Sequence, residues 1–357
     1  MYPYEKVSHM STKEPPNLEL PTCGDQPLWD ISSGALNLPA LIVAEEVGLF
    51  PFLEKTPATP EEVAHHFSFN LRAAEALLGV LASLGFLAKY QGRFYITEVS
   101  RNFLLPESPY NWGTLLRAPP VIPDLCSAIK GILKMPEDKM GERAAEVFGK
   151  LKEPGKMDQK QVKIIAEKSH VRSLPAALAV AKWGDFKGVK RLLDMGGGAG
   201  SFCIGLALRY LEMEFTVADL AAICEIATQY IADYQLEDRI SVQAVDMFED
   251  EWPSGYDAVF FSNIFHDWGK ERSIYLGQKS FDILPSGGRI YLHELLLPDT
   301  KDSPPALTVY SMVLLFSTTG NLFTAGELDE LLTECGFEDI TIIHTFGYHS
   351  LIMGKKP

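Results

Sequence analysis

The chain has 357 residues, 46% of them apolar, and a formal net charge of −15. At roughly 100–200 residues per domain, this length predicts two domains, and the apolar content is sufficient for packed cores. Because 32 Lys and Arg residues stand against 47 Asp and Glu residues, the composition argues against a nucleic-acid partner.

The cysteines and the N-terminus indicate the cellular compartment. None of the five cysteines forms a C-x-x-C pair, which is typical of buried free thiols in a reducing compartment and excludes a structural zinc site. The first ten residues lack the apolar core of a signal peptide, and nowhere do about 18 apolar residues run together. We therefore expect a cytoplasmic protein without a membrane partner.

The first 110 residues predict a flexible segment followed by a small helical domain. Residues 1–28 combine prolines with polar residues, and we expect no secondary structure there. Thr59-Pro60-Glu61-Glu62 predicts a helix start, with a capping hydroxyl, a proline at the first helical position and a glutamate three residues after the cap. Apolar residues at three-and-four spacing predict that the next helix buries one face and ends at Gly85: Leu71, Ala74, Leu77, Leu78, Leu81 and Leu84.

The sequence predicts a hairpin over residues 86–97, with its turn at Gln91-Gly92. Two helices followed by a hairpin are the order of a winged helix, and we assign this domain to residues 29–110. A winged helix can bind DNA, but only Arg72 is basic on the would-be recognition helix. The charge therefore argues against a winged-helix regulator and favours a dimerisation or substrate-covering role.

The remainder of the chain predicts a connector and an α/β domain. Residues 111–185 are expected to form a helical connector and pocket lid, with a helix over about 162–183. From residue 186 onward strand and helix signals alternate, which predicts a mainly parallel sheet covered on both faces, a Rossmann-like doubly wound domain over 186–357. The expected elements after the first strand (189–195) are 215–218, 223–234, 240–244, 258–262, 271–284, 290–296, 325–335 and 340–346.

A glycine run follows the first strand of this domain. The segment from Asp194 to Gly200 has the pattern D-x-G-x-G-x-G, with glycines at 196, 198 and 200. Glycine lets backbone approach a ligand closely at the end of such a strand. A dinucleotide fingerprint would need a third glycine where Ser201 stands, which argues against a nicotinamide dehydrogenase. The acid can instead accept a hydrogen bond from a ligand ammonium.

Two further acids follow the next strands. Asp219 is suited to ribose hydroxyls, because a carboxylate at the end of the second strand plays that part in related nucleotide sites. Asp246 offers an acceptor for an exocyclic amine, and the adjacent Met247 and Phe248 offer apolar atoms for an adenine ring. Taken alone, Asp219 could cap the next helix and Asp246 could merely end a strand, but three acids at successive strand ends favour a nucleoside site.

His266 follows the fourth strand and is predicted to open the next helix. Ligands of open α/β sheets lie outside the carboxyl ends of strands, and an imidazole has a pKa suited to proton removal near neutral pH. Glu294, at the end of the fifth strand, can bind the second imidazole nitrogen and fix the tautomer. His293 points to the opposite side of that strand and is expected in the core. Asp267 lacks further ligands at metal-binding spacing, so we expect no metal.

Together these residues resemble the S-adenosylmethionine-dependent small-molecule O-methyltransferases of the plant caffeate and bacterial hydroxyindole type. The resemblance covers the chain from Trp29 to the end and implies a homodimer formed through the winged-helix domain. It implies that S-adenosylmethionine is the cofactor and that a small-molecule hydroxyl is the acceptor. It places the catalytic group at His266, Glu294 and Asp267. The implied cofactor contacts are Asp194, Gly196, Gly198, Gly200, Asp219, Leu220, Asp246, Met247, Phe248 and Ser262.

Two departures from the family pattern keep other acceptors open. Plant members place a second glutamate near Leu322, where this chain has no acid, and a lysine before the base that is absent here. Carbon or nitrogen methylation, or cofactor binding without methylation, therefore remain alternatives. The expected wall of the acceptor pocket includes Met312, Phe316 and Asn321, although the first two could equally belong to a core helix.

Overall fold

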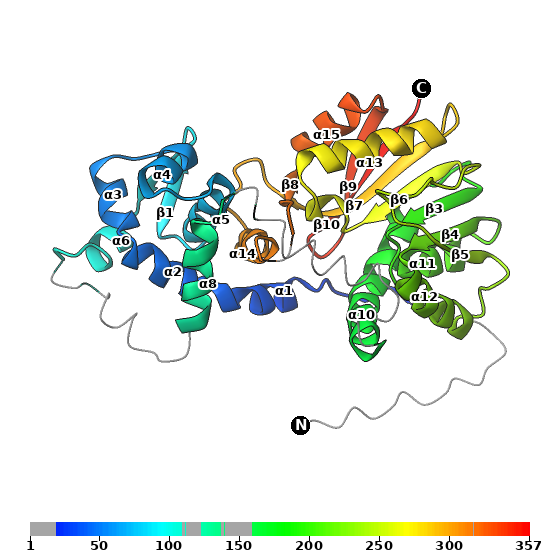
Figure 1. The fold of residues 1–357 in the computed structure, drawn as a ribbon, viewed down its shortest axis with the longest axis horizontal. Helices are drawn as coiled ribbons and strands as arrows, with labels where there is room; N and C mark the ends of the chain where they lie inside the picture. The colour runs from blue at the N-terminus through cyan, green and yellow to red at the C-terminus, as the bar shows by residue number, and fades with distance from the viewer. Residues whose placement is uncertain (1–18, 109–110, 112–122, 137–138, 140–158, 317) are drawn as a thin grey trace.

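A computed structural model describes residues 19–108, 111, 123–136, 139, 159–316 and 318–357. It shows a helical N-terminal domain and an α/β C-terminal domain side by side along the long axis of the molecule (Figure 1). Most of the segment expected to be flexible, 1–18, and much of the connector, 112–122 and 140–158, lie outside the described residues.

The N-terminal domain has the predicted order of helices followed by a hairpin. The hairpin pairs β1 (Leu87–Tyr90) with β2 (Arg93–Ile96) in antiparallel register. The helices of this part are α1 (Gln26–Ser33), α2 (Asn37–Glu46), α3 (Leu49–Lys55), α4 (Pro60–Phe67), α5 (Leu71–Ser83), α6 (Glu98–Phe103) and α8 (Pro123–Leu133), with a 3₁₀ turn η1 (Gly34–Leu36) between α1 and α2.

Local sequence signals explain several of these boundaries. The predicted capping box is present, since the Thr59 side chain accepts from the Glu62 N–H and the Glu62 carboxylate accepts from the Thr59 N–H. Gly85 follows α5 with a φ of +82°, a conformation that favours glycine. The expectation of no structure before residue 29 was wrong at its end, because α1 begins at Gln26, with Pro27 in its first turn.

The C-terminal domain is built on one mixed sheet with the order β5-β4-β3-β6-β7-β10-β9. The first five strands of this order are parallel, while β10 runs antiparallel to both neighbours. The short β8 (Phe323–Thr324) pairs with β7 outside this path. The strands are β3 (Arg191–Met195), β4 (Glu214–Asp219), β5 (Ile240–Ala244), β6 (Ala258–Ser262), β7 (Arg289–Leu297), β9 (Glu338–Phe346) and β10 (His349–Lys355).

Helices cover both faces of this sheet, as the alternation of signals predicts (Figure 1). Successive strand residues enter different cores: Phe260 packs beneath α10–α12, and Phe261 packs with α13 and α15. The doubly wound fold is thus confirmed. The helices are α10 (Gln159–Trp183), α11 (Ser201–Arg209), α12 (Ala221–Asp233), α13 (Lys270–Ile283), α14 (Pro305–Leu314) and α15 (Ala325–Glu334).

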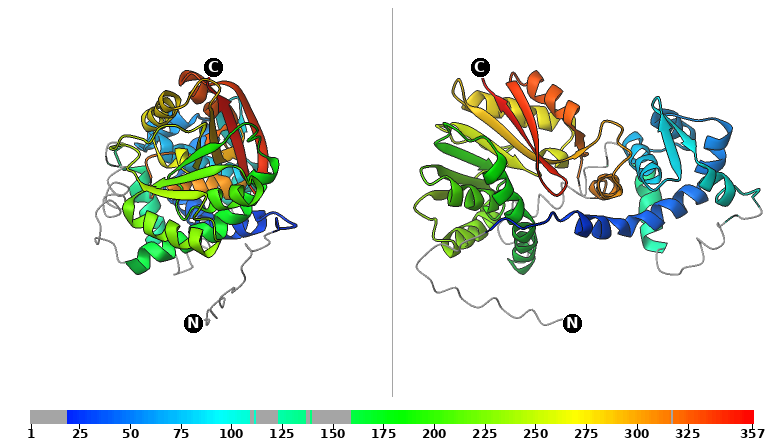
Figure 2. Two further views of the ribbon diagram at one scale, coloured as in Figure 1. Left: turned by 90° about the vertical axis from the view of Figure 1, so that its right-hand side faces the viewer. Right: turned by 180° about the vertical axis from the view of Figure 1, so that it is seen from behind.

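Two helices connect the domains. α14 follows β7 in the sequence but packs against α5, and its Val309 and Met312 belong to the core of the N-terminal domain. α1 lies against α14 and is tied to the β9–β10 turn, because Gln26 Nε2 donates to the Gly347 carbonyl (2.8 Å). Seen from behind, α1 runs from the α/β domain to the helical domain (Figure 2).

The expectations for membrane segments and cysteines can be compared with the described residues. Within them no single helix is long and apolar enough to cross a membrane; the bent pair Gln26–Glu46 and Leu49–Lys55 meets the test only when taken together. All five cysteines are free thiols, and four of them are buried. The expectation that all are buried was wrong for Cys23, which is exposed.

Candidate active site

The glycine run forms a tight loop between β3 and α11. Gly196, Gly198 and Gly200 have φ values of +72°, +57° and +75°, which side chains with a Cβ rarely adopt. No described atom lies within 4 Å of the position that a Cβ on Gly198 would take, so the loop presents open space there. A Cβ on Gly196 would lie 2.5 Å from Ile264 Cδ1 and 3.1 Å from Met247 Cε. The loop therefore packs closely against the segments that follow β5 and β6.

Asp194 is nearly fully buried at the end of β3, with 1% of its surface exposed. One carboxylate oxygen accepts from the Cys203 thiol (3.4 Å), and the other, Oδ1, has no hydrogen-bond partner among the described residues. Burial raises the pKa of Asp194 to about 7. An orphaned buried carboxylate oxygen is costly, and a ligand ammonium would satisfy it. The end of β3 thus fits the amino-acid end of S-adenosylmethionine.

Asp219 lies at the end of β4 and is bonded to the same loop. Its Oδ2 accepts from the Gly198 N–H (2.9 Å) and its Oδ1 from the Leu220 N–H (2.7 Å). Burial raises the pKa of Asp219, while these two hydrogen bonds act against the rise. Each carboxylate oxygen has a second lone pair, so Asp219 can still accept from two ribose hydroxyls.

The segment after β5 supplies the third acid and an aromatic group. Asp246 Oδ1 accepts from the Phe248 N–H (3.0 Å), which fixes the turn. The Phe248 ring meets the Trp268 ring edge-on at 4.7 Å, and the Arg272 guanidinium lies 4.8 Å and 4.9 Å from the two ring centroids. The hydrogen-bond acceptor of Asp246 and the apolar ring of Phe248 therefore lie on adjacent residues of one turn, as an adenine site requires.

Ser262 ends β6, and its hydroxyl hydrogen-bonds neighbouring side chains of the protein. Its hydroxyl hydrogen-bonds His293 Nδ1 (3.0 Å) and accepts from Asn263 Nδ2 (3.2 Å). His293 is fully buried, as expected of a core residue; it stacks on the His349 ring at 4.7 Å, and burial lowers the pKa of His293 to about 3. Both imidazoles are therefore uncharged near neutral pH and lie in the core next to Ser262. A cofactor contact by Ser262 stays a prediction.

His266 lies in the 3₁₀ turn η3 (Phe265–Asp267), not in the first turn of α13, which begins at Lys270. The expectation that His266 opens the helix was therefore wrong, because Gly269 is extended and separates the turn from the helix. The side chain is buried, and Nδ1 lies 2.5 Å from Glu294 Oε2. On the other side, Nε2 lies 3.7 Å from Asp267 Oδ1.

Glu294 is fully buried and has a partner for each oxygen. Oε2 faces His266, and Oε1 accepts from the N–H groups of Ile264 (3.0 Å) and Phe265 (2.9 Å). An acceptor at Nδ1 keeps the proton on Nδ1 and leaves Nε2 free to accept one. Burial opposes protonation of His266, but the charge and hydrogen bond of Glu294 outweigh it and raise the pKa of His266. Burial raises the pKa of Asp267 to about 6.

A loop after α14 packs directly on η3. The Thr319 N–H donates to the Asp267 carbonyl (3.2 Å), and a Cβ on Gly320 would lie 2.2 Å from the His266 carbonyl oxygen. The loop is held from the N-terminal domain, since Arg72 donates to the Thr318 carbonyl (3.3 Å). Leu322, where plant relatives were expected to have a second glutamate, is buried in an apolar cluster. Gly320 was not singled out from the sequence, because a lone glycine in a loop carries no pattern.

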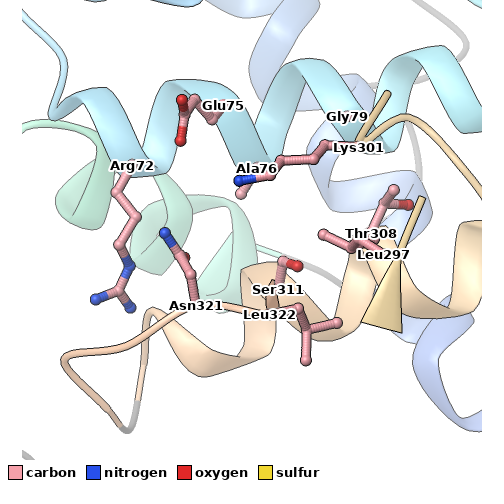
Figure 3. A pocket seen from close by; sticks show the side chains of 10 residues that line it. All are labelled: Arg72, Glu75, Ala76, Gly79, Leu297, Lys301, Thr308, Ser311, Asn321 and Leu322. Carbon is pink, nitrogen blue, oxygen red and sulfur yellow. The ribbon is translucent and has the colours of Figure 1, made fainter. Parts of the chain in front are cut away.

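The three residues expected in the pocket wall do not line one pocket together. Met312 is 1% exposed in the N-terminal core, and Phe316 packs against that core. The core-helix alternative therefore describes the packing of these two side chains. Asn321 lines a polar pocket between α5 and α14 together with Arg72 and Glu75 (Figure 3). Neither His266 nor any of the three acids lines this pocket.

Sequence patterns missed an aromatic wall next to His266. Tyr310 of α14 meets the His266 ring edge-on at 5.9 Å, and Trp29 of α1 meets Tyr310 at 5.4 Å. Arg172 of α10 lies with its guanidinium carbon 5.7 Å from the Trp29 ring. No sequence signal could have joined these residues, because they come from three distant segments. In the part of the chain that the structure describes, no three His, Cys, Asp or Glu side chains are grouped as a metal site.

Comparison with known proteins identifies the family of the chain. A family model described as an O-methyltransferase domain matches residues 142–338, and one described as an O-methyltransferase dimerisation domain matches 29–106. The 3-hydroxy-5-methyl-1-naphthoate 3-O-methyltransferase of Streptomyces sahachiroi is 30% identical over 347 residues, 96% of this chain and 97% of that protein.

Two further similarities bear on function and fold. The L-tyrosine C(3)-methyltransferase of Streptomyces lavendulae is 25% identical over 335 residues, 92% of this chain and 90% of that protein. A crystal structure of an O-methyltransferase family 2 protein from Planctomyces limnophilus, in complex with apigenin, has a TM-score of 0.81 at 22% identity and covers 95% of this chain and 98% of that one. The chain therefore belongs to the O-methyltransferase family and is an S-adenosylmethionine-dependent O-methyltransferase of small molecules.

Proposed function

We propose that this enzyme methylates a hydroxyl of a small aromatic acceptor, with His266 as the general base. The observation that carries the proposal is the anchoring of Glu294, whose Oε1 is held by two backbone N–H groups while Oε2 faces His266 Nδ1. This arrangement fixes both the orientation of the imidazole and its tautomer. Nε2 is thereby left as the proton acceptor.

The cofactor contacts are proposed from the same strand ends. Asp194 binds the ammonium of the methionine end, and the glycine loop lies along the cofactor with Gly196, Gly198 and Gly200. Asp219 and Leu220 hold the ribose, and the 246–248 segment with Ser262 holds the adenine end. When bound, S-adenosylmethionine supplies an electrophilic methyl group on a sulfonium. The chain contributes orientation, which can be worth effective molarities of about 10⁵–10⁸ M.

The proton of the acceptor hydroxyl passes to the protein during the reaction. The acceptor oxygen would form its bond to the methyl group as the bond between that methyl and the sulfonium sulfur breaks, leaving S-adenosylhomocysteine, and the hydroxyl proton would pass to His266 Nε2. The buried charge of Glu294 at Nδ1 stabilises the resulting imidazolium, and Asp267, 3.7 Å from Nε2, adds a second acid on the other side of the ring. General-base assistance of this kind contributes roughly 10²–10⁴-fold.

The aromatic character of the acceptor is supported by the wall of Trp29 and Tyr310 beside the base. Flat aromatic surfaces pack well against such rings. The named substrate of the Streptomyces sahachiroi relative is a hydroxylated naphthoate, and the Planctomyces limnophilus structure contains apigenin. Met312 and Phe316 contribute in this proposal by packing α14 on the N-terminal domain, which positions Tyr310.

Carbon methylation is the second candidate, favoured by the similarity to a tyrosine C(3)-methyltransferase. Mass spectrometry and NMR of the product distinguish a new methoxy group from a new carbon–carbon bond.

We further propose a homodimer formed through the 29–106 domain, as its family description suggests, in a reducing cytoplasm. Sedimentation at micromolar concentration tests the dimer, and a monomer only would contradict it.

The test of the base compares His266→Gln with His65→Gln, a change of an exposed histidine on α4. With a radiolabelled methyl donor and a panel of phenols, we expect His266→Gln to lower kcat by about 10²–10⁴-fold. Affinity for S-adenosylhomocysteine, measured by calorimetry, should stay nearly constant, and the control should retain activity. Near-full turnover by His266→Gln would refute the general-base role.

A further inference from the structure

Arg172 lies at one end of the aromatic wall that leads to the catalytic base. Its side chain is exposed on α10, with the guanidinium carbon 5.7 Å from the Trp29 ring centroid. The Trp29 ring contacts the Tyr310 ring at 5.4 Å, and Tyr310 contacts the His266 ring at 5.9 Å. These four side chains thus form one row of pairwise contacts, from the guanidinium through two aromatic rings to the imidazole.

Arg172 is a cation without a carboxylate partner on this surface. Among the described residues, no carboxylate oxygen lies within 4 Å of its guanidinium, whereas Glu294 is occupied by His266 and two backbone N–H groups. Its positive charge nevertheless acts on this group of residues, since it lowers the pKa values of His266, Asp267 and Tyr310 against other influences. The surface beside the base therefore holds a positive charge that the proposed proton transfer does not use.

An arginine in such a place has a specific ligand chemistry. The planar guanidinium binds a carboxylate through two parallel hydrogen bonds and stacks on aromatic faces while it does so. The Trp29 ring and the Tyr310 side chain contact this group, but a neutral phenol would offer it no negative charge. The wall between Arg172 and His266 is aromatic, so a flat ring can lie along it with one substituent at each end.

We propose that Arg172 binds a ring carboxylate of the acceptor while the acceptor hydroxyl lies at His266 Nε2, so that the substrates are aromatic hydroxy acids. This inference rests on the proposed function and names its substrate class. Trp29 supports the site by holding the guanidinium against its ring.

Matched acceptors test the proposal: 3-hydroxybenzoate and 3-hydroxy-1-naphthoate, each against its methyl ester. We expect the wild-type kcat/KM to be about 10- to 150-fold higher for each acid than for its ester, the range of a charged hydrogen bond. Arg172→Gln should bring this ratio close to one, mainly through KM, and Arg172→Lys should give an intermediate ratio. Lys182→Gln, which removes another cation of α10, is the matched control and should keep the wild-type ratio.

Calorimetric binding of the same acids and esters to the protein saturated with S-adenosylhomocysteine separates the two proposals. Acid-selective binding that Arg172→Gln abolishes, without turnover of any acceptor, would refute aromatic O-methylation and support the carboxylate site. Turnover of acids and esters at equal kcat/KM would refute the carboxylate site and leave the methylation intact. An equal loss for acids and esters in Arg172→Gln would show that Arg172 only braces Trp29, and would overturn the inference.

Discussion

Replacement of Glu294 by glutamine should switch the tautomer of the His266 imidazole, the general base that we propose. Glutamine offers one oxygen and one NH₂ group in place of two oxygens. The oxygen must face the N–H groups of Ile264 and Phe265, because the NH₂ group would otherwise meet two donors in a fully buried site. The NH₂ group then donates to His266 Nδ1, and the imidazole proton moves to Nε2. The base nitrogen is thereby occupied.

The expected loss follows from this geometry. The variant loses general-base catalysis, and the two backbone hydrogen bonds to the glutamine oxygen hold the imidazole in the wrong tautomer. The kcat should therefore fall by about 10³–10⁴-fold, equivalent to about 4–5.5 kcal/mol of activation free energy. Steady-state kinetics with labelled methyl donor measures the fall, and ¹⁵N shifts of His266 report the tautomer directly.

A control and a refuting result complete this experiment. Glu334→Gln removes an exposed carboxylate of α15 and should leave kcat unchanged. Affinity for S-adenosylhomocysteine should remain the same in both variants, because Glu294 contacts none of the strand-end acids in the described contacts. If Glu294→Gln keeps more than a tenth of wild-type kcat, or retains the proton on Nδ1, the reasoning about the tautomer is wrong.

Three further predictions follow from the site. Only the neutral imidazole accepts a proton, and Glu294 raises the pKa of His266. The kcat should therefore fall as the pH is lowered, with a midpoint above the ordinary imidazole pKa of about 6.5. A midpoint below about 6.5 would contradict this prediction. Asp219→Ala should weaken S-adenosylhomocysteine binding about 10- to 150-fold for each lost ribose hydrogen bond in calorimetry, and unchanged affinity would remove Asp219 from the site. Gly320→Ala should lower kcat about tenfold or more by displacing η3, whereas Gly326→Ala, whose Cβ meets nothing closer than 3.9 Å, should not; equal kcat values would show that the loop yields freely.

The sequence predicted the positions of most strand-end residues, because glycines and acids at the ends of parallel strands depend only on the local chain and the layered fold. Their contacts with the cofactor stay predictions. Asp194 and Asp219 lie at the ends of β3 and β4, as the alternation of strands and helices indicated. Glu294 was expected at the end of its strand but lies inside β7, which continues to Leu297. The strand β10 was not predicted, since its apolar run is short and begins at polar His349 and Ser350. Its antiparallel pairing with β7 and β9 becomes evident only in the assembled sheet.

The acceptor side of the site was predicted less well, for a physical reason. Apolar periodicity indicates that one face of a helix is buried but does not identify the partner that covers it. Met312 on α14 therefore could not be distinguished as a pocket residue or a core residue, and the structure places it in the N-terminal core. Trp29, Arg172 and Tyr310 meet only through tertiary packing, so no motif could connect them.

α14 serves both domains at once, and this has a consequence for how acceptor preference can change. The helix carries Tyr310 toward His266 and, two residues on and facing the other way, Met312 into the dimerisation domain. A substitution far from the cofactor, in the N-terminal core, can tilt this helix and reshape the surface beside His266 without altering any residue that touches substrate. Exchange of N-terminal domains between relatives should therefore carry part of the substrate profile with it, and laboratory evolution toward new acceptors should accumulate mutations in both halves of the chain.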